Sequence, residues 1–404
     1  MANVCRGMSK RIERRAFLAA AAAASATAAL GNGIAYGQQP GFAAANIQLD
    51  PSPSGRRMLA EFMGLSFEAP LIPGSVFFNG GNRTLIDYVR GLGGRGILQF
   101  GGANLDTTAY AAPDLANLAQ FASAVNWRIV LGLSMSAPVF NVADQAAKAS
   151  QALGEQLLAF ELGSAPDLRF KDYGTFLQTF RARVASVSAN DPAAMYAGPA
   201  TAEHADWAAR FAQDERPQLV LLTQQYAHTG GELALQVGVR DIPKTAALVD
   251  LPYRIEQIVL SSNNVANALW ALDFSLELAA SGADGANFHD DADAQRGPLY
   301  QALLLVKESV NARFVPMKLQ GGNNNFTAYA VERDDGTRVV TLINRDSNLG
   351  AAVNLNAGRP PRNPRVRRLT ALSMDTTQIN VVDWQPVDPS TLEVPPASAA
   401  LVTL

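Results

Sequence analysis

The chain has 404 residues, of which 48% are hydrophobic and 17% are charged, and its formal net charge at pH 7 is −3. This composition is typical of a folded globular protein and excludes a disordered chain. The slightly acidic balance gives no electrostatic attraction to nucleic acid or anionic lipid, so we expect neither as a partner. After the N-terminal segment, no apolar run is long and uncharged enough to span a membrane.

The first segment has the pattern of an export signal. Arg14-Arg15-Ala16-Phe17-Leu18 matches the twin-arginine motif, and an alanine-rich apolar run follows from Ala19 to Leu30. Ala35 and Gly37 are small residues of the kind found before a cleavage site. A membrane anchor is the alternative, but the apolar run is short. We predict that residues 1–37 are a signal peptide and that the mature protein is periplasmic or extracellular.

Residues that could bind a metal or act as a thiol nucleophile are scarce. The single cysteine, Cys5, lies in the predicted signal, so the mature chain would contain neither a disulfide nor a catalytic thiol. The three histidines, His204, His228 and His289, lack the H-x-x-x-H spacing of a helical zinc site. We therefore expect no metal and no cofactor.

Strand and helix patterns alternate between residues 61 and 311. Eight short apolar runs with strand character are separated by segments with helical spacing of apolar residues. This helical spacing is weak in one segment, residues 230–252. The predicted strands are Glu61–Glu68, Gly96–Gly102, Trp127–Met135, Leu157–Leu162, Ala194–Ala197, Leu219–Thr223, Tyr253–Leu260 and Gly285–His289. This alternation predicts an α/β fold, a (β/α)₈ TIM barrel.

The spacing of apolar residues changes to a period of two near Phe314. Short alternating segments separated by Asp-Gly, Asn and Pro turns predict a C-terminal antiparallel β-sandwich over residues 312–404. A lone strand pattern around Ile47 precedes the barrel. We expect this segment, residues 38–60, to add a strand to the sandwich.

One stretch stands out within the barrel pattern. An apolar strand through Phe160 ends at Glu161-Leu162-Gly163-Ser164-Ala165-Pro166-Asp167, and the ends of barrel strands carry the catalytic groups of such enzymes. This segment resembles the E-x-G-N-E-P-D segment of retaining glycoside hydrolases. Further matching segments are Phe62–Glu68, Ile97–Gly102, Ala268–Asp273 and Gly285–His289. Together they resemble glycoside hydrolase family 79, the β-glucuronidase and heparanase group.

The resemblance implies two catalytic glutamates, one as acid/base and one as nucleophile. The acid/base position falls on Ala165, whose methyl group cannot transfer a proton. Glu161 lies four residues earlier, at the depth of the barrel core. Asp167 is predicted to cap the next turn rather than to replace the missing acid.

The nucleophile position falls on Gln257, when the segment Arg254-Ile255-Glu256-Gln257 is aligned with the R-x-x-E pattern of the family. The neighbouring Glu256 is a possible substitute. A shift of one residue along a strand turns a side chain to the opposite face, so Glu256 is expected to face the helix layer. The alternative is a bulge that turns it into the barrel.

Other residues match positions expected to line a sugar-binding cleft. These candidate substrate-binding residues are Glu68, Gly101, Gly102, Asn104, Ser164, Tyr226, His289 and Asp290. Tyr226 could equally be a packing residue at the rim. Gln99 stands where the family tends to have arginine, so the resemblance does not extend to uronic-acid specificity.

Two functions are compatible with these residues. The favoured one is an exported, carbohydrate-binding pseudoenzyme that kept the cleft and lost both catalytic carboxylates. The alternative is an active retaining β-glycosidase that uses relocated groups, with Glu256 as nucleophile and Glu68, Asp290 or Asp291 as proton donor. A carbohydrate is the expected ligand in both cases.

Overall fold

A computed structural model describes residues 41–404, except residues 75, 137, 229–236, 294 and 361–362. The predicted signal peptide and Cys5 lie outside the described residues. Among the helices that the structure describes, none is long and apolar enough to cross a membrane.

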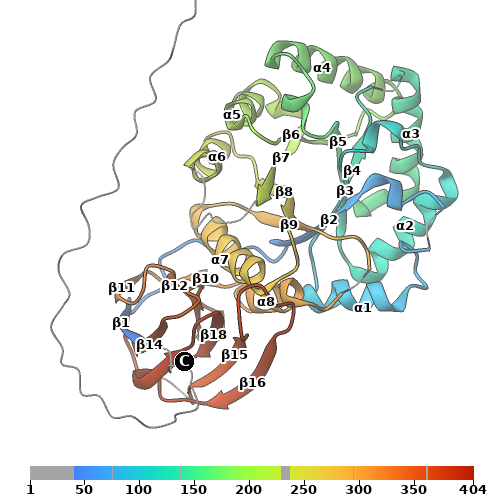
Figure 1. The fold of residues 1–404 in the computed structure, drawn as a ribbon. Coiled ribbons are helices and arrows are strands. Elements are labelled where there is room, and N and C mark those ends of the chain that lie inside the picture. Colours follow the sequence, from blue (N-terminus) through green and yellow to red (C-terminus); the bar gives the residue numbers. More distant parts are fainter. Residues whose placement is uncertain (1–40, 75, 137, 229–236, 294, 361–362) are drawn as a thin grey trace, which may run out of the picture. The chain divides into compact units, whose positions relative to one another are not determined.

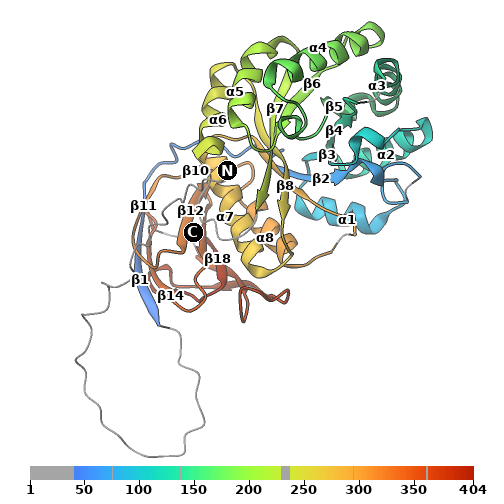
Figure 2. The same cartoon turned by 45° about the horizontal axis from the view of Figure 1, so that its top comes forward.

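Eight parallel strands close into a barrel in the order β2 to β9. The strands are β2 (Met63–Glu68), β3 (Ile97–Gly101), β4 (Arg128–Leu133), β5 (Leu157–Leu162), β6 (Tyr196–Thr201), β7 (Leu219–His228), β8 (Tyr253–Leu260) and β9 (Gly285–His289). Figures 1 and 2 show the helices following one another around the outside of these strands. The predicted (β/α)₈ barrel is confirmed.

The outer helices are α1 (Arg83–Leu92), α2 (Ala112–Val125), α3 (Val139–Leu153), α4 (Tyr173–Asn190), α5 (Ala205–Asp214), α6 (Val237–Leu248), α7 (Val265–Ser281) and α8 (Pro298–Lys307). α6 lies in the stretch whose helical pattern is weak. Pro243 lies inside α6, and proline is unfavourable in a helix interior, which weakens the sequence signal there.

α7 is the most apolar of the helices in sequence and is capped at both ends. The Asn264 side chain accepts a hydrogen bond from the Asn267 amide, and Gly282 ends the helix in the left-handed conformation. The buried Asp273 accepts hydrogen bonds from Thr327 (2.9 Å) and Tyr329 (2.7 Å) of the sandwich. The Asp of the family-like segment Ala268–Asp273 therefore has a structural role.

The second part of the fold has two sheets, ordered β11-β1-β14-β17 and β10-β12-β13-β18-β15-β16. Its strands are β1 (Phe42–Leu49), β10 (Arg313–Phe314), β11 (Met317–Gly321), β12 (Phe326–Glu332), β13 (Arg338–Asn344), β14 (Gly350–Asn356), β15 (Arg365–Thr370), β16 (Asn380–Pro386), β17 (Leu392–Val394) and β18 (Ser398–Thr403). All neighbouring pairs are antiparallel except β1 with β14. The strand around Ile47 is β1, where Ile47 pairs with Leu319 of β11 and Leu355 of β14.

Candidate active site

A polar cluster lies inside the barrel around Glu161 on β5. The Glu161 carboxylate accepts hydrogen bonds from the Thr223 hydroxyl on β7 (2.6 Å) and the Gln99 amide on β3 (3.1 Å). In the closed sheet, β4 separates β3 from β5, and β6 separates β5 from β7. Side chains from strands that are not neighbours can meet only in the interior. Glu161 therefore points inward, at the core depth expected from the sequence, and is 1% exposed.

Glu256 on β8 lies against this cluster. Its carboxyl group is fully buried and lies close enough to that of Glu161 for the two to interact, although β8 is three strands away from β5. Glu256 thus points into the barrel, and the expectation that it faces the helix layer is wrong. The cause is a β-bulge: Gln224 of β7 pairs with Ile255 and Gln225 pairs with Gln257, which makes Glu256 the extra residue.

The two carboxyl groups cannot both be ionised at this distance without strong repulsion. Burial, and then the negative charge of Glu161, raise the pKa of Glu256 well above its usual value. Burial also raises the pKa of Glu161 to about 7, although hydrogen bonds from Thr223, Gln99 and Glu256 oppose the rise.

Among the described residues, no donor in good geometry reaches either Glu256 oxygen. The nearby Gln225 amide favours the charged form of Glu256 but donates to the Ser164 hydroxyl at 2.8 Å. Burial and the neighbouring carboxyl group therefore both favour a proton on Glu256.

The bulge turns Gln257 inward as well. Its amide nitrogen lies 3.4 Å from Nδ1 of His289, at the end of β9. The imidazole is partly exposed, and its Nε2 lies 3.8 Å from the exposed carboxylate of Asp291. Glu256 and Gln257 therefore contact different partners, the first in the polar cluster and the second at the C-terminal strand ends, which we call the mouth.

At the mouth end of β5, Ala165 has a positive φ of 45° and its amide donates to the Ala200 carbonyl. Its side chain carries no proton donor. Asp167 caps a different turn from the one predicted: its carboxylate accepts from the amides of Ala202, Glu203 and His204 at 2.7–3.0 Å, in the loop after β6. The turn after β5 therefore offers no replacement for a catalytic acid at Ala165.

The ends of β2 and β3 bring Glu68 and two glycines together. A Cβ atom on Gly102 would lie 2.1 Å from a Glu68 carboxylate oxygen, and Gly102 has a φ of +88°. Only glycine fits there without strain. Gly101 leaves comparable room for the Gln99 amide. Asn104 follows in an exposed loop, where its carbonyl accepts from the Thr107 and Thr108 hydroxyls.

Tyr226 is not at the rim. Its ring is 5% exposed and packs against Trp270 and Phe274 of α7, with centroids 5.7 and 5.0 Å away. Its place on β7, one residue after the inward-pointing Gln225, turns it toward the helix layer. The expectation that Tyr226 binds sugar is therefore corrected: it is a core residue.

Asp290 lies beside His289 but faces α1. Its carboxylate accepts from the Tyr88 hydroxyl (2.8 Å) and the Ala292 amide (2.7 Å). Burial raises its pKa above the usual value, while the Tyr88 hydrogen bond opposes this. Together with His289, it lines a hollow of about 260 Å³ beside β8 and β9.

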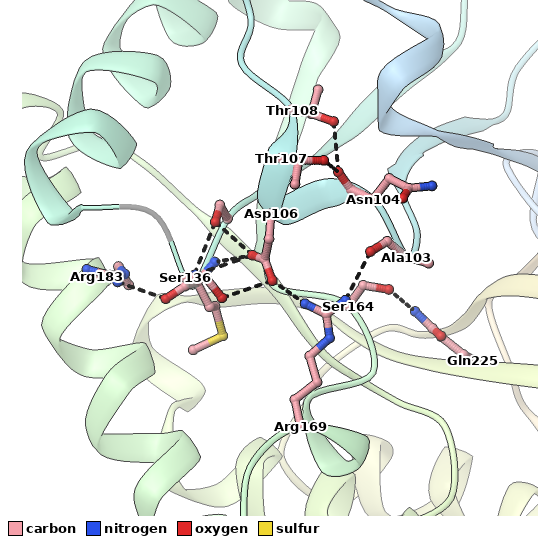
Figure 3. A network of polar contacts seen from close by, with 12 residues as sticks. Ala103, Asn104, Asp106, Thr107, Thr108, Ser136, Ser164, Arg169, Arg183 and Gln225 are labelled. Atoms are coloured by element: carbon pink, nitrogen blue, oxygen red, sulfur yellow. Dashed lines mark hydrogen bonds and ion pairs between the residues drawn. The ribbon is translucent and has the colours of Figure 1, made fainter.

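A second polar network at the mouth was not predicted from the sequence. Asp106, in the turn after β3, accepts from Ser134 (2.7 Å) and from the Ser136 hydroxyl (3.0 Å), and it pairs with Arg169 beyond β5 (Figure 3). Arg169 also donates to the Ala103 carbonyl at 3.1 Å. Three separate segments, after β3, β4 and β5, supply these residues, and no local motif links them. The only sequence signal was their position just after predicted barrel strands.

No protein-family model matches the chain, and no curated protein matches it significantly. Solved structures do. The GH51 arabinofuranosidase from Xanthomonas axonopodis pv. citri aligns with a TM-score of 0.67 and 13% identity, over 90% of this chain and 100% of that one. An α-L-arabinofuranosidase from Thermotoga maritima, solved with arabinose, aligns with a TM-score of 0.66 and 12% identity, over 89% and 100%.

A GH39 β-xylosidase from Caulobacter crescentus gives a TM-score of 0.62 and 13% identity, over 89% of this chain and 99% of that one. At such identities the likeness concerns the fold alone. The described chain thus has the fold of TIM-barrel glycoside hydrolases.

Proposed function

We propose that this protein is an exported carbohydrate-binding protein, similar to family 79 glycoside hydrolases, that does not hydrolyse glycosides. The observation that carries the proposal is the contact between Glu161 and Glu256. The barrel holds two inward carboxyl groups, but they lie against each other in its buried interior instead of flanking an open cleft, and burial raises the pKa of both.

The separation of the two groups argues against hydrolysis. Retaining glycosidases hold their carboxyl groups roughly 5–5.5 Å apart, and inverting enzymes roughly 6.5–9.5 Å apart. Glu161 and Glu256 lie against each other in the barrel interior, which leaves no room for a glycosidic bond between them. Both residues are almost completely buried, and the strand end that would supply a proton donor carries Ala165.

Polar groups at the mouth support carbohydrate binding. Asn104, Arg169 and His289 lie at the C-terminal ends of three barrel strands and are at least partly exposed. Ligands of barrel proteins bind at this end, whatever the chemistry. The similar solved structures include enzymes named for arabinofuranosides and xylosides, which makes pentose-containing glycans the first ligands to test.

The test is equilibrium binding of the full-length protein to immobilised oligosaccharides, followed by mass spectrometry of the recovered ligand. We expect saturable binding to at least one neutral oligosaccharide and recovery of that ligand at its original mass. Cleaved ligand would contradict the absence of hydrolysis. Failure to bind any glycan would contradict the binding function.

A retaining β-glycosidase is the second candidate, and the inward orientation of Glu256 favours it. Glu256 lies on the seventh strand of the barrel, where the family-79 resemblance implies the nucleophile. In this reading, substrate binding separates Glu256 from Glu161 and frees one carboxylate for attack. An activated 2-deoxy-2-fluoro glycoside would then leave a covalent adduct on the peptide that contains Glu256, detectable by mass spectrometry. Absence of the adduct after prolonged incubation would exclude this candidate.

A further inference from the structure

A hollow of about 260 Å³ lies at the mouth between β4 and β5, on the side of α4. It is lined by Asp106, Met135, Ser136, Gly163, Ser164, Pro166, Arg169, Phe170 and Thr179. Pockets for drug-sized ligands measure roughly 300–1,000 Å³. This hollow therefore has room for one ring with its substituents and not for a chain of rings.

The hollow contains a neutralised ion pair. Although burial opposes it, hydrogen bonds from Ser134 and Ser136 and the charge of Arg169 hold the pKa of Asp106 below its usual value, so Asp106 is ionised at neutral pH. The Arg169 guanidinium pairs with this carboxylate and keeps further N–H groups beyond those it donates to Asp106 and Ala103. An anionic ligand would meet the Asp106 carboxylate behind Arg169, and a cationic ligand would meet the guanidinium. The site therefore favours an uncharged ligand.

Its hydroxyl groups supply both donors and acceptors (Figure 3). Ser164 accepts from the Gln225 amide and keeps its own proton for donation. Ser136 donates to Asp106, and Thr179 donates to the Thr175 carbonyl, so the lone pairs of both remain available to accept. Such mixed groups match sugar hydroxyls, each of which donates and accepts.

The rest of the lining is apolar. Met135, Pro166 and Phe170 lie among the lining residues, and the Phe170 ring is half-buried and packs edge-on against Phe176, with centroids 5.8 Å apart. An aromatic ring held in this way can pack against the C–H face of a sugar while the hydroxyls bond elsewhere.

We infer that this hollow binds a single uncharged sugar ring at the end of a glycan. The inference rests on the proposed carbohydrate-binding function and adds the location and the charge class of the ligand. The hollow beside β8 and β9 differs in the charge of its lining, because it is lined by three acidic residues, Asp290, Asp291 and Asp293.

The test is isothermal titration calorimetry of the full-length protein with xylotriose, arabinotriose, cellotriose and a trisaccharide that ends in glucuronate. We expect a neutral trisaccharide to bind, and the glucuronate-terminated one to bind at least tenfold more weakly. Phe170→Ala should weaken binding of the neutral ligand at least tenfold, and the isosteric Thr179→Val about threefold. Asp293→Asn, in the other hollow, is the control and should bind like the unchanged protein.

The outcomes separate the two proposals. Wild-type affinity in both Phe170→Ala and Thr179→Val, or tighter binding of the glucuronate-terminated ligand, overturns this inference and leaves the binding function intact. Loss of affinity in Asp293→Asn alone places the ligand in the other hollow, which also overturns it. No binding of any trisaccharide overturns both. If Phe170→Ala does not fold, as judged by circular dichroism, Thr179→Val decides.

Discussion

At one depth, the barrel interior is an apolar cluster that includes Ile97, Ala159 and Leu221. The next inward-facing positions along the same three strands carry hydrogen-bonded polar side chains instead. These are Gln99, Glu161 and Thr223. Successive inward positions on a strand are two residues apart, so the interior changes character within one step along the barrel.

The two depths are stabilised in different ways. The apolar cluster is stabilised by burial and packing, as in the filled interior of other TIM barrels. The polar cluster has satisfied hydrogen bonds to Glu161 but also contains Glu256, whose burial beside another carboxyl group is unfavourable. A departure from the rules of stable packing is commonest where a protein binds or reacts. The proposal that this protein does not hydrolyse glycosides therefore depends on the polar depth.

The largest expected loss of stability comes from a charge placed at the apolar depth. Leu221→Asp would put an unpaired carboxylate beside Ile97 and Ala159 and should lower the free energy of unfolding by more than about 3 kcal/mol. Urea denaturation measures this change. Leu248→Asp is the matched control, because Leu248 is 86% exposed. Similar stabilities of the two variants would show that the apolar depth tolerates a charge as well as the surface does, against this description.

A smaller effect concerns the pH dependence of the polar depth. Glu161 has a folded-state pKa of about 7, above its ordinary value of 4.5, so between these values the folded protein binds more protons than the unfolded chain. The free energy of unfolding should therefore fall as the pH rises from 4.5 through 7 and stay low above it. Glu256→Gln supplies an amide donor to Glu161 and should be more stable than the unchanged protein at pH 8, by about 2 kcal/mol.

Denaturation curves at pH 5 and pH 8 measure this difference. Glu155→Gln, at an exposed position, is the control and should follow the unchanged protein at both values. A Glu256→Gln variant that is less stable at pH 8 than at pH 5 by the same margin as the unchanged protein would show that the two carboxyl groups do not interact.

The smallest effect comes from a single hydrogen bond of the polar depth. Thr223→Val removes the 2.6 Å donor to Glu161 and an acceptor of the Ala200 amide, with little change of shape. It should cost about 1 kcal/mol of unfolding free energy and raise the pKa of Glu161 further. Thr391→Val, at an exposed site, is the control. Equal stabilities of the two variants would mean that the Thr223 hydrogen bond contributes nothing.

The alternating pattern was enough to predict the barrel, because each strand and helix carries its own local signal. The orientation of Glu256 was not predictable, since the bulge depends on how β8 pairs with β7 and not on the β8 sequence alone. Tyr226 was misplaced for the same reason, because its side relative to the barrel follows from register. The contact of Asp106 with Arg169 joins segments that only the closed sheet brings together.

The absence of hydrolysis is tested most directly by the release of chromophore from aryl β-glucuronide, aryl β-xyloside and aryl α-arabinofuranoside, comparing the unchanged protein with Glu256→Gln. Activated leaving groups need little help from a proton donor, so these substrates would reveal even a weak nucleophile. We predict no release above the buffer rate by either protein. Turnover by the unchanged protein that Glu256→Gln abolishes would contradict this account and make Glu256 a catalytic nucleophile.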